Sequence, residues 1–312
     1  MSNRELLYAR DVYGTVLKEL GKLYPEIVVL DADLSSSTRT SLFAKEFPHR
    51  FFNVGVAEQN MMGISAGLAS CGKVVFVSTF AMFATARPLD QIRNTICYNN
   101  LNVKIVATHG GITVGEDGAS HQAIEDIAFL RSIPNIKIIV PCDAPESAEA
   151  IKVAYKTEGP FYIRLGRAKV PTIENKKDFV LGEGYVLEEG KDLAIIACGI
   201  MVNEALIANQ ILKKKGYSAT IVNMHTIKPI DKKLITTLAR EYKRLLVCEE
   251  HQSIGGLYSA VCEVVADSEP VIVKSVGVKD RFGQSGLPQE LMDIYELSSI
   301  YIAQRAEELI LQ

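Results

Sequence analysis

Apolar residues recur along this chain in two alternating patterns. Runs of four or five consecutive apolar residues, such as Val103–Ala107, predict buried strands. Between them lie longer stretches such as Arg10–Leu23, where apolar residues return at every third or fourth position, as in an amphipathic helix. Regular alternation of strand and helix predicts an α/β protein whose parallel sheets are covered by helices on both faces.

The predicted elements fall into two series. Strands are expected at residues 27–30, 74–77, 103–107, 136–140, 161–165, 193–197, 219–223, 245–248 and 271–276. Helices are expected at residues 10–23, 58–70, 89–98, 124–131, 144–155, 202–215, 232–242, 255–265 and 301–311. Residues 31–40 are polar and predict a loop after the first strand.

The segment from Gly166 to Gly190 interrupts this alternation with a proline, a charged run and several glycines. Only residues 185–187 have the character of a strand there. We therefore expect a first α/β domain at residues 1–168, a linker at 169–190 and a second parallel α/β domain at 191–312.

Composition narrows the class of protein. The net charge is −3 and the sequence pI is about 6.0, so the chain has no overall basic character for binding nucleic acid. The N-terminus is polar and does not resemble a signal peptide, and no apolar run reaches the roughly 18 residues of a membrane span. Six scattered cysteines without a CxxC pair indicate reduced thiols of a cytoplasmic protein.

Residues 108–122 are the stretch richest in candidate chemistry. They follow the strand Val103–Ala107 and contain His109, His121, Glu116, Asp117 and four glycines. Glycine allows sharp turns and close approach to a ligand, and histidine exchanges protons near neutral pH. Loops at the carboxyl ends of strands are where open α/β sheets bind ligands, so this stretch predicts a functional loop.

Two other motifs do not support a nucleotide or metal site. The sequence Gly67–Lys73 approaches a phosphate-binding loop, but Val74 stands where a hydroxyl is needed, and the order of helix and strand is reversed. No G-x-G-x-x-G opens a helix after a strand. Asp31 and Asp33 allow a metal site, but a hydrogen-bonded pair at a strand end is the better interpretation.

Glu58, Phe80 and Phe83 each allow two interpretations. Glu58 opens a predicted helix, where a carboxylate either complements the helix dipole or acts as a functional acid. Small apolar residues at 63–69 predict that this helix is buried against a neighbour. The spacing of Phe80 and Phe83 suits the core, but the two rings can also form a stacking wall for a planar ligand.

Three motifs in order resemble one family. They are Val54-Gly-Val-Ala-Glu58-Gln-Asn-Met, then Ser78-Thr-Phe80-x-x-Phe83, then Thr108-His109 with Gly115-Glu-Asp117-Gly-x-x-His121-Gln. Together they resemble transketolase, and more narrowly the C-terminal subunit of a split transketolase. The similarity covers essentially the whole chain. It implies a pyrimidine-binding domain at 1–168 and a transketolase C-terminal domain at 191–312.

The resemblance implies a thiamine diphosphate enzyme that transfers a two-carbon ketol unit from a ketose phosphate to an aldose phosphate. The family acid that matches Glu58 hydrogen-bonds the cofactor's aminopyrimidine ring at N1′ and activates it. Phe80 and Phe83 match aromatic positions around that ring, and Ala86 stands where some members have a third aromatic. Asp33 matches an acidic position near the cofactor at the subunit interface.

Substrate contacts are also implied by the resemblance. His109, which with Glu58 is a catalytic candidate, and Asp117 match groups that hydrogen-bond sugar hydroxyls. His121 matches a histidine near the substrate phosphate. Phosphate-binding positions of the family match Arg167, Ser37 and Arg10. Arginine suits phosphate because its guanidinium can donate two parallel hydrogen bonds. For Arg164 we expect a surface ion pair.

One part of the family's site has no match. The family's diphosphate domain holds Mg²⁺ with a Gly-Asp-Gly motif followed by an asparagine about 30 residues later, and this pair is not found in the sequence. We therefore expect no metal ligands on this chain. A separate N-terminal transketolase subunit is expected to hold the diphosphate and Mg²⁺ or Ca²⁺, in an α2β2 assembly.

Two other functions remain open. The β subunit of a 2-oxoacid dehydrogenase E1 shares the architecture and the cofactor glutamate, but the loop from His109 to His121 with Arg167 favours sugar phosphates. A non-catalytic scaffolding paralogue is the second alternative, and the presence of Glu58 argues against it.

Overall fold

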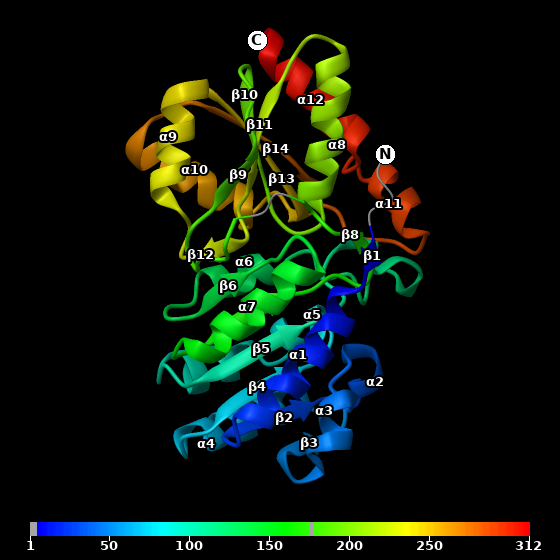
Figure 1. The fold of residues 1–312 in the computed structure, drawn as a ribbon, viewed down its shortest axis with the longest axis vertical. Coiled ribbons are helices and arrows are strands. Elements are labelled where there is room, and N and C mark those ends of the chain that lie inside the picture. The colour runs from blue at the N-terminus through cyan, green and yellow to red at the C-terminus, as the bar shows by residue number, and fades with distance from the viewer. Residues whose placement is uncertain (1–4, 175–176) are drawn as a thin grey trace.

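The computed structural model describes residues 5–174 and 177–312, which form two α/β domains stacked along the long axis of the molecule (Figure 1). The first domain is the lower one in Figure 1, and the second domain, at the top, carries the C-terminus. Both have a parallel-dominated sheet at the centre, which confirms the predicted fold class.

Seven strands form the sheet of the first domain, in the order β12-β6-β7-β5-β4-β2-β3. Six of them run parallel, and β12 pairs antiparallel with β6. Their bounds are β2 Ile27–Asp31, β3 Phe51–Asn53, β4 Val74–Ser78, β5 Val103–Ala107, β6 Lys137–Ile139, β7 Phe161–Arg164 and β12 Thr226–Lys228.

Helices cover both faces of this sheet. On one face α1 (Ala9–Leu23) packs against α7 (Ala144–Lys156). The other face is covered by α4 (Glu58–Ser70), the π-helical segment η2 (Gln91–Cys97) and α6 (Asp126–Arg131). Short helices lie in the connections: α2 Ser35–Thr38, α3 Ser41–Glu46, η1 Pro48–Arg50 and α5 Ala81–Thr85.

The second domain has a five-stranded sheet in the order β14-β13-β10-β11-β9, with β9 antiparallel. Its strands are β9 Tyr185–Glu188, β10 Leu193–Ala197, β11 Ala219–Asn223, β13 Arg244–Gln252 and β14 Ile272–Val278. Helices α8 and α12 pack together on one side, and α9 and α10 on the other (Figure 1). The helices are α8 Met201–Lys214, α9 Lys232–Tyr242, α10 Leu257–Ser268, α11 Pro288–Ile294 and α12 Ser299–Leu311.

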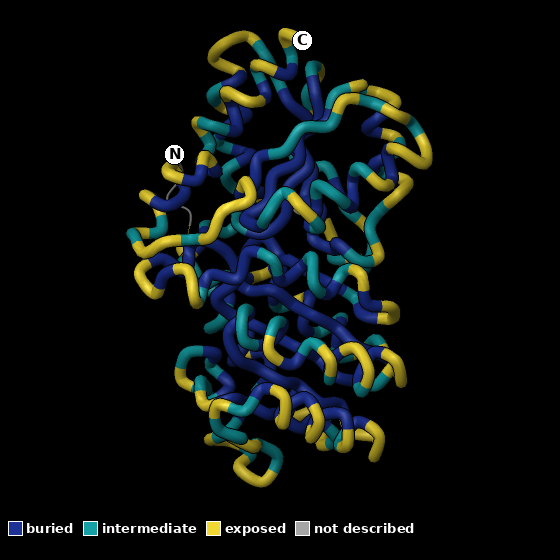
Figure 2. The backbone as a smooth tube through the Cα atoms, turned by 180° about the vertical axis from the view of Figure 1, so that it is seen from behind, coloured by how far each residue is buried: buried dark blue, intermediate teal, exposed yellow. Residues whose placement is uncertain are grey.

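The two domains share a core. One cluster of buried apolar side chains runs from the first sheet into the second, including Ile138 and Val140 on one side and Val222 and Met224 on the other. Figure 2 shows buried chain continuing through the region where the domains meet. Strand β12 adds a hydrogen-bonded link, because this segment lies between β11 and α9 of the second domain but pairs with β6 of the first.

Several segments differ from the prediction. Residues 31–40 are not a plain loop, because Ser35–Thr38 form the short helix α2 beside the buried Asp31. Strand β12 and helix α11 have no counterpart among the predicted elements. β1 (Leu6–Leu7) and β8 (Val170–Pro171) form a further antiparallel pair.

The expected division at residues 168 and 191 stays a prediction. Strand β9 lies in the segment expected as linker, and it forms the edge of the second sheet. In the described parts of the chain, no helix has the length and apolarity needed to cross a membrane.

Candidate active site

The candidate residues gather at one edge of the first sheet because its central strands are parallel and end level. Asp31 of β2 pairs in register with Ser78 of β4, and Ala107 of β5 with Arg164 of β7. The residues that follow these strands therefore meet at the carboxyl edge. Asp33, Phe80, His109 and Arg167 all lie in those following segments.

Asp31 and Asp33 do different things at this edge. The buried carboxylate of Asp31 accepts hydrogen bonds from the Leu34 amide at 2.6 Å and the Thr38 hydroxyl at 2.7 Å, which anchors α2. Burial raises the pKa of Asp31. Asp33 is exposed with a φ of 64°, and it accepts a hydrogen bond from Asn53 at 2.9 Å. This arrangement fits the hydrogen-bonded interpretation of the pair.

Glu58 begins helix α4 and is only 4% exposed. Its Oε1 lies 2.8 Å from Nη1 of Arg87. The Arg87 guanidinium also lies over the Phe83 ring, 4.2 Å from its centroid. Arg87 therefore covers both the carboxylate and an aromatic face. Our sequence analysis missed Arg87, because nothing in the local pattern connects residues 29 positions apart.

Phe80 and Phe83 stand beside the two histidines of the loop. The Phe80 ring stacks on His109 with centroids 3.7 Å apart, and on Phe83 at 6.1 Å. Phe83 meets His121 edge-on at 5.2 Å. Phe80 is buried and Phe83 is half-buried. The four rings thus form one aromatic wall at the sheet edge.

His109 is held as a neutral imidazole. Burial lowers its pKa to about 3, with further lowering by the charges of Arg10, Arg167 and His121. Its Nδ1 shares a hydrogen bond of 2.8 Å with the Thr108 hydroxyl, and the residue has a φ of 62°. A neutral imidazole both donates and accepts hydrogen bonds, so His109 suits contacts to hydroxyl groups.

Positive charge collects around His109. Arg10 donates to the Ser37 carbonyl at 3.5 Å, and its buried Nε has no partner among the described residues. Burial and the neighbouring Arg39 lower the pKa of Arg10. Arg167 donates to the Val114 carbonyl at 2.5 Å and to Glu116 at 2.8 Å. Guanidinium groups so placed suit an anionic ligand.

Asp117 and His121 lie in the second half of the loop. Asp117 is the last residue of the short helix η3 (Ile112–Asp117) and is exposed. His121 is half-buried, and its Nδ1 lies 3.0 Å from the Ser120 hydroxyl. Ser37 is half-buried in α2, and its backbone carbonyl accepts a hydrogen bond from Arg10, whose charge also acts on His109.

The expectation of a surface ion pair at Arg164 was wrong. Arg164 is 5% exposed, and its Nε donates to Asp126 at 2.8 Å. Its Nη2 donates to the carbonyls of Ala123 and Glu250. Burial lowers the Arg164 pKa, but the negative charges of Asp126 and Glu250 outweigh this and raise it. Arg164 is therefore a structural cation inside the joint between the domains.

Helix α4 is less buried than its small residues suggest. One face packs on the sheet, but Gln59, Asn60, Gly63 and Gly67 are exposed. A Cβ atom added at Gly63 or Gly67 would meet nothing within 4 Å. This face begins next to Glu58, so another chain could approach the backbone of α4 closely beside the candidate site.

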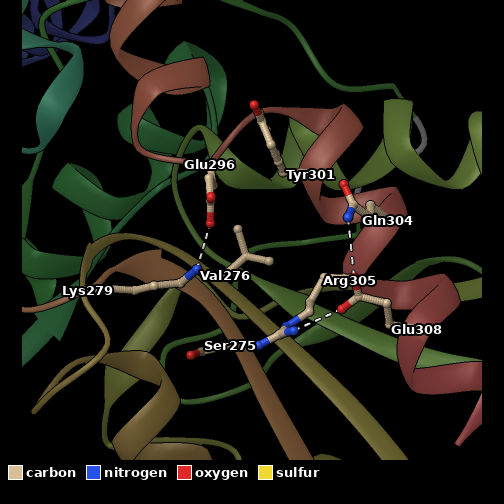
Figure 3. A pocket seen from close by; sticks show the side chains of 8 residues that line it. All are labelled: Ser275, Val276, Lys279, Glu296, Tyr301, Gln304, Arg305 and Glu308. Carbon is tan, nitrogen blue, oxygen red and sulfur yellow. Dashed lines mark hydrogen bonds and ion pairs between the residues drawn. The ribbon is translucent and has the colours of Figure 1, made fainter.

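A pocket of about 110 Å³ lies in the second domain, between β14 and α12 (Figure 3). Its charged side chains neutralise one another, since Lys279 pairs with Glu296 and Arg305 with Glu308. None of the candidate residues lines it. Across residues 5–174 and 177–312 no three His, Cys, Asp or Glu side chains are grouped to hold a metal ion.

Two family models account for nearly all of the chain. Residues 7–172 match the transketolase pyrimidine binding domain, and residues 182–302 match the transketolase C-terminal domain. Fold and family models thus define a two-domain chain with a pyrimidine binding domain and a transketolase C-terminal domain. The chain belongs to the transketolase family.

Relatives point to the split form of that family. A putative transketolase C-terminal section from Methanocaldococcus jannaschii is 51% identical, covering 96% of this chain and 95% of that protein. A 6-deoxy-6-sulfo-D-fructose transketolase subunit from a Clostridium species is 38% identical, with 96% and 94% covered. A solved split gene transketolase, described as an inactive beta4 tetramer, superimposes with a TM-score of 0.89 at 48% identity over 98% of both chains.

Proposed function

We propose that this chain is the catalytic C-terminal subunit of a two-chain transketolase. The assembled enzyme would transfer a two-carbon ketol unit from a ketose phosphate to an aldose phosphate. The observation that carries the proposal is the meeting of Glu58, the Phe80–Phe83 wall and His109 at one sheet edge. These groups come from three separate segments of the sequence, and a scaffolding role does not require them to converge.

The residues present fit thiamine diphosphate. Arg87 contacts both the buried carboxylate of Glu58 and the half-buried Phe83 ring, which supports a pyrimidine that stacks on that ring and hydrogen-bonds the carboxylate. When bound, the cofactor would supply the nucleophilic carbon that attacks the ketose carbonyl. Glu58 would hydrogen-bond N1′ of the pyrimidine and share a proton there. For this, Arg87 must release the carboxylate oxygen that it holds in this structure.

The loop residues would orient the sugar. His109 stays neutral because its pKa is about 3, so it can hydrogen-bond sugar hydroxyls without adding charge. Asp117 is exposed at the end of η3 and would accept from further hydroxyls. His121, Arg167, Arg10 and Ser37 would bind the terminal phosphate, with the guanidinium groups supplying the charge.

A partner subunit would complete the site. We propose an N-terminal transketolase chain that holds the diphosphate and Mg²⁺ or Ca²⁺, in an α2β2 assembly in the cytoplasm. Asp33 and the exposed face of α4 would contact the partner beside Glu58. The open space at Gly63 and Gly67 supports this, since it allows close helix packing.

The test is a donor panel on the two mixed subunits with cofactor and metal. We expect turnover of ketose phosphates with an aldose phosphate acceptor, and none by either chain alone. A 6-sulfo ketose belongs in the panel, because one relative is named for that substrate. Decarboxylation of a 2-oxoacid with transfer to a lipoyl carrier, without ketol transfer, would instead support the dehydrogenase alternative.

A further inference from the structure

We propose that Glu250, in the second domain, is a positioning residue for the loop at residues 108–122, here termed the substrate loop. The inference rests on the proposed function, because it assigns the second domain a part in the same site. Glu250 lies on β13 and the loop lies on the first domain, so the contact crosses the joint between them.

The central contact is short and buried. Oε1 of Glu250 accepts a hydrogen bond from the amide of Thr113 at 2.5 Å. Glu250 is 4% exposed, so water does not compete for this bond. Thr113 lies between His109 and Asp117 in the loop, so one contact restrains the backbone on which both depend.

The backbone of the substrate loop packs closely against the Glu250 carboxylate. Gly111 has a φ of 92°, and a Cβ atom there would lie 2.2 Å from Cδ of Glu250. At Gly110 a Cβ atom would lie 2.8 Å from Cγ of Arg164. Arg164 in turn donates to the Glu250 carbonyl at 3.0 Å. The two glycines therefore let the loop approach Glu250 and Arg164 closely, which no other residue type would allow.

A second attachment holds the far part of the loop. Nε2 of Gln122 donates to the Gln284 carbonyl of the second domain at 2.9 Å and to the Ile112 carbonyl at 3.1 Å. Helix α11 packs against η3 in the same region. Of these two attachments to the second domain, the one at Glu250 is nearer to His109 along the chain, and its loss should shift the imidazole against Phe80. A displacement of about 1 Å can cost up to about a hundredfold in rate.

Glu249 provides a matched control on the same strand. It is also fully buried, and burial raises the pKa of both carboxyls. Its oxygens accept from the amides of Leu257 at 2.7 Å and Tyr258 at 2.9 Å, at the start of α10. Substitution of Glu249 therefore perturbs a buried acceptor at the start of α10 that makes no hydrogen bond to the substrate loop.

The experiment compares Glu250→Asp, Glu250→Gln, Glu249→Asp and Glu249→Gln in the assembled two-chain enzyme. Aspartate keeps the charge beside Arg164 but is one methylene shorter, so it cannot reach the Thr113 amide without movement. Glutamine keeps the reach and loses the charge. We expect kcat/KM for a ketose phosphate to fall about 10- to 100-fold in Glu250→Asp and less in Glu250→Gln. Glu249→Asp should lower the melting temperature and leave kcat/KM within about threefold, since α10 lies away from the loop.

Amide hydrogen exchange supplies a readout that does not need activity. Glu250→Asp should speed exchange at residues 112–116, and Glu249→Asp should not. Equal exchange and equal kcat/KM for the two aspartate variants would overturn the inference, as would a greater loss in Glu250→Gln than in Glu250→Asp. Absence of ketol transfer by the wild-type pair would overturn the proposed function instead, while the exchange comparison would still decide whether Glu250 holds the loop.

Discussion

At the scale of single residues, the environment of Glu58 makes its substitution informative. Glu58→Gln keeps the volume and an oxygen that can accept from Arg87, so the fold should survive. It removes the acid proposed to act at the cofactor ring. We expect kcat of the assembled enzyme to fall at least about 100-fold, the scale for a positioned acid or base. Turnover near the wild-type value would show that Glu58 only begins helix α4.

Substitution of Arg167 can distinguish a loss of phosphate binding from a general disturbance of the active site. Loss of a charge-assisted hydrogen bond costs about 1.5–3 kcal/mol, or about 10- to 150-fold in affinity. Arg167→Ala should raise KM by that amount for phosphorylated donors and hardly change it for hydroxypyruvate, which lacks the phosphate end.

Glu116→Gln is the matched control for that prediction. It removes the exposed partner that pairs with Arg167 and leaves the guanidinium in place, so KM for phosphorylated donors should stay the same or fall. If Arg167→Ala weakens both classes of donor equally, Arg167 maintains the loop through Val114 rather than binding substrate.

The lowered pKa of His109 makes stability depend on pH. Its pKa is about 3 in the folded chain against 6.5 for a free imidazole, because burial disfavours the charged ring. Below pH 6.5 the unfolded chain therefore binds a proton that the folded chain binds only near pH 3. This contribution to stability is complete above pH 6.5 and is lost as pH falls toward 3, at about 1.4 kcal/mol per pH unit.

Urea unfolding of the chain at pH 7 and pH 5 checks this sign. His109→Gln should reduce the acid sensitivity of the unfolding free energy by about 2 kcal/mol over that interval. His49→Gln, at an exposed histidine, is the control and should leave the sensitivity unchanged. The same acid sensitivity in His109→Gln and wild type would show that His109 is not held neutral.

At the scale of the element, glycine on the exposed face of α4 lowers the stability of the helix but leaves room for a partner subunit to pack closely. Glycine in a helix interior costs about 0.5–1 kcal/mol relative to alanine, and the space around Gly63 is open. Gly63→Ala should therefore stabilise the isolated chain by that amount in urea unfolding. It should also weaken binding of the partner subunit, because the added methyl group stands on the proposed interface.

Analytical ultracentrifugation of the mixed subunits measures the second effect. Gln304→Ala, on an exposed position of α12 in the other domain, should leave assembly unchanged. Unimpaired assembly in Gly63→Ala would place the partner elsewhere on the molecule.

At the scale of the whole molecule, the proposed function predicts that this chain needs a partner subunit to complete its site. With Mg²⁺ and thiamine diphosphate but no partner, we expect weak cofactor binding by calorimetry and no turnover. Mixed with the N-terminal subunit it should form a 2:2 complex with full activity. Activity of the isolated chain would contradict this.

Local pattern was enough to predict most of the elements and the candidate loop. Helices 58–70 and 232–242 and strand 103–107 have the predicted bounds. A helical period of 3.6 residues or a short apolar run can be recognised from neighbouring residues alone. Strand β12, with three residues, is too short to show a period and forms only because β6 offers a free edge. The motifs around Glu58, Phe80 and His109 were enough to identify the resemblance to the transketolase family.

The tertiary structure decided what those residues touch. Arg87 reaches Glu58 across 29 positions, and Glu250 reaches Thr113 across 137, so no local period could reveal either contact. The charge of Arg164 suggested a surface residue, but its side chain is buried and donates both to Asp126 in the first domain and to the Glu250 carbonyl in the second. The neutral state of His109 likewise depends on burial and on Arg10 and Arg167, which only the packing of the sheet edge brings near it. Local sequence determines which elements form, whereas charge and contact depend on distances that arise only when the elements pack.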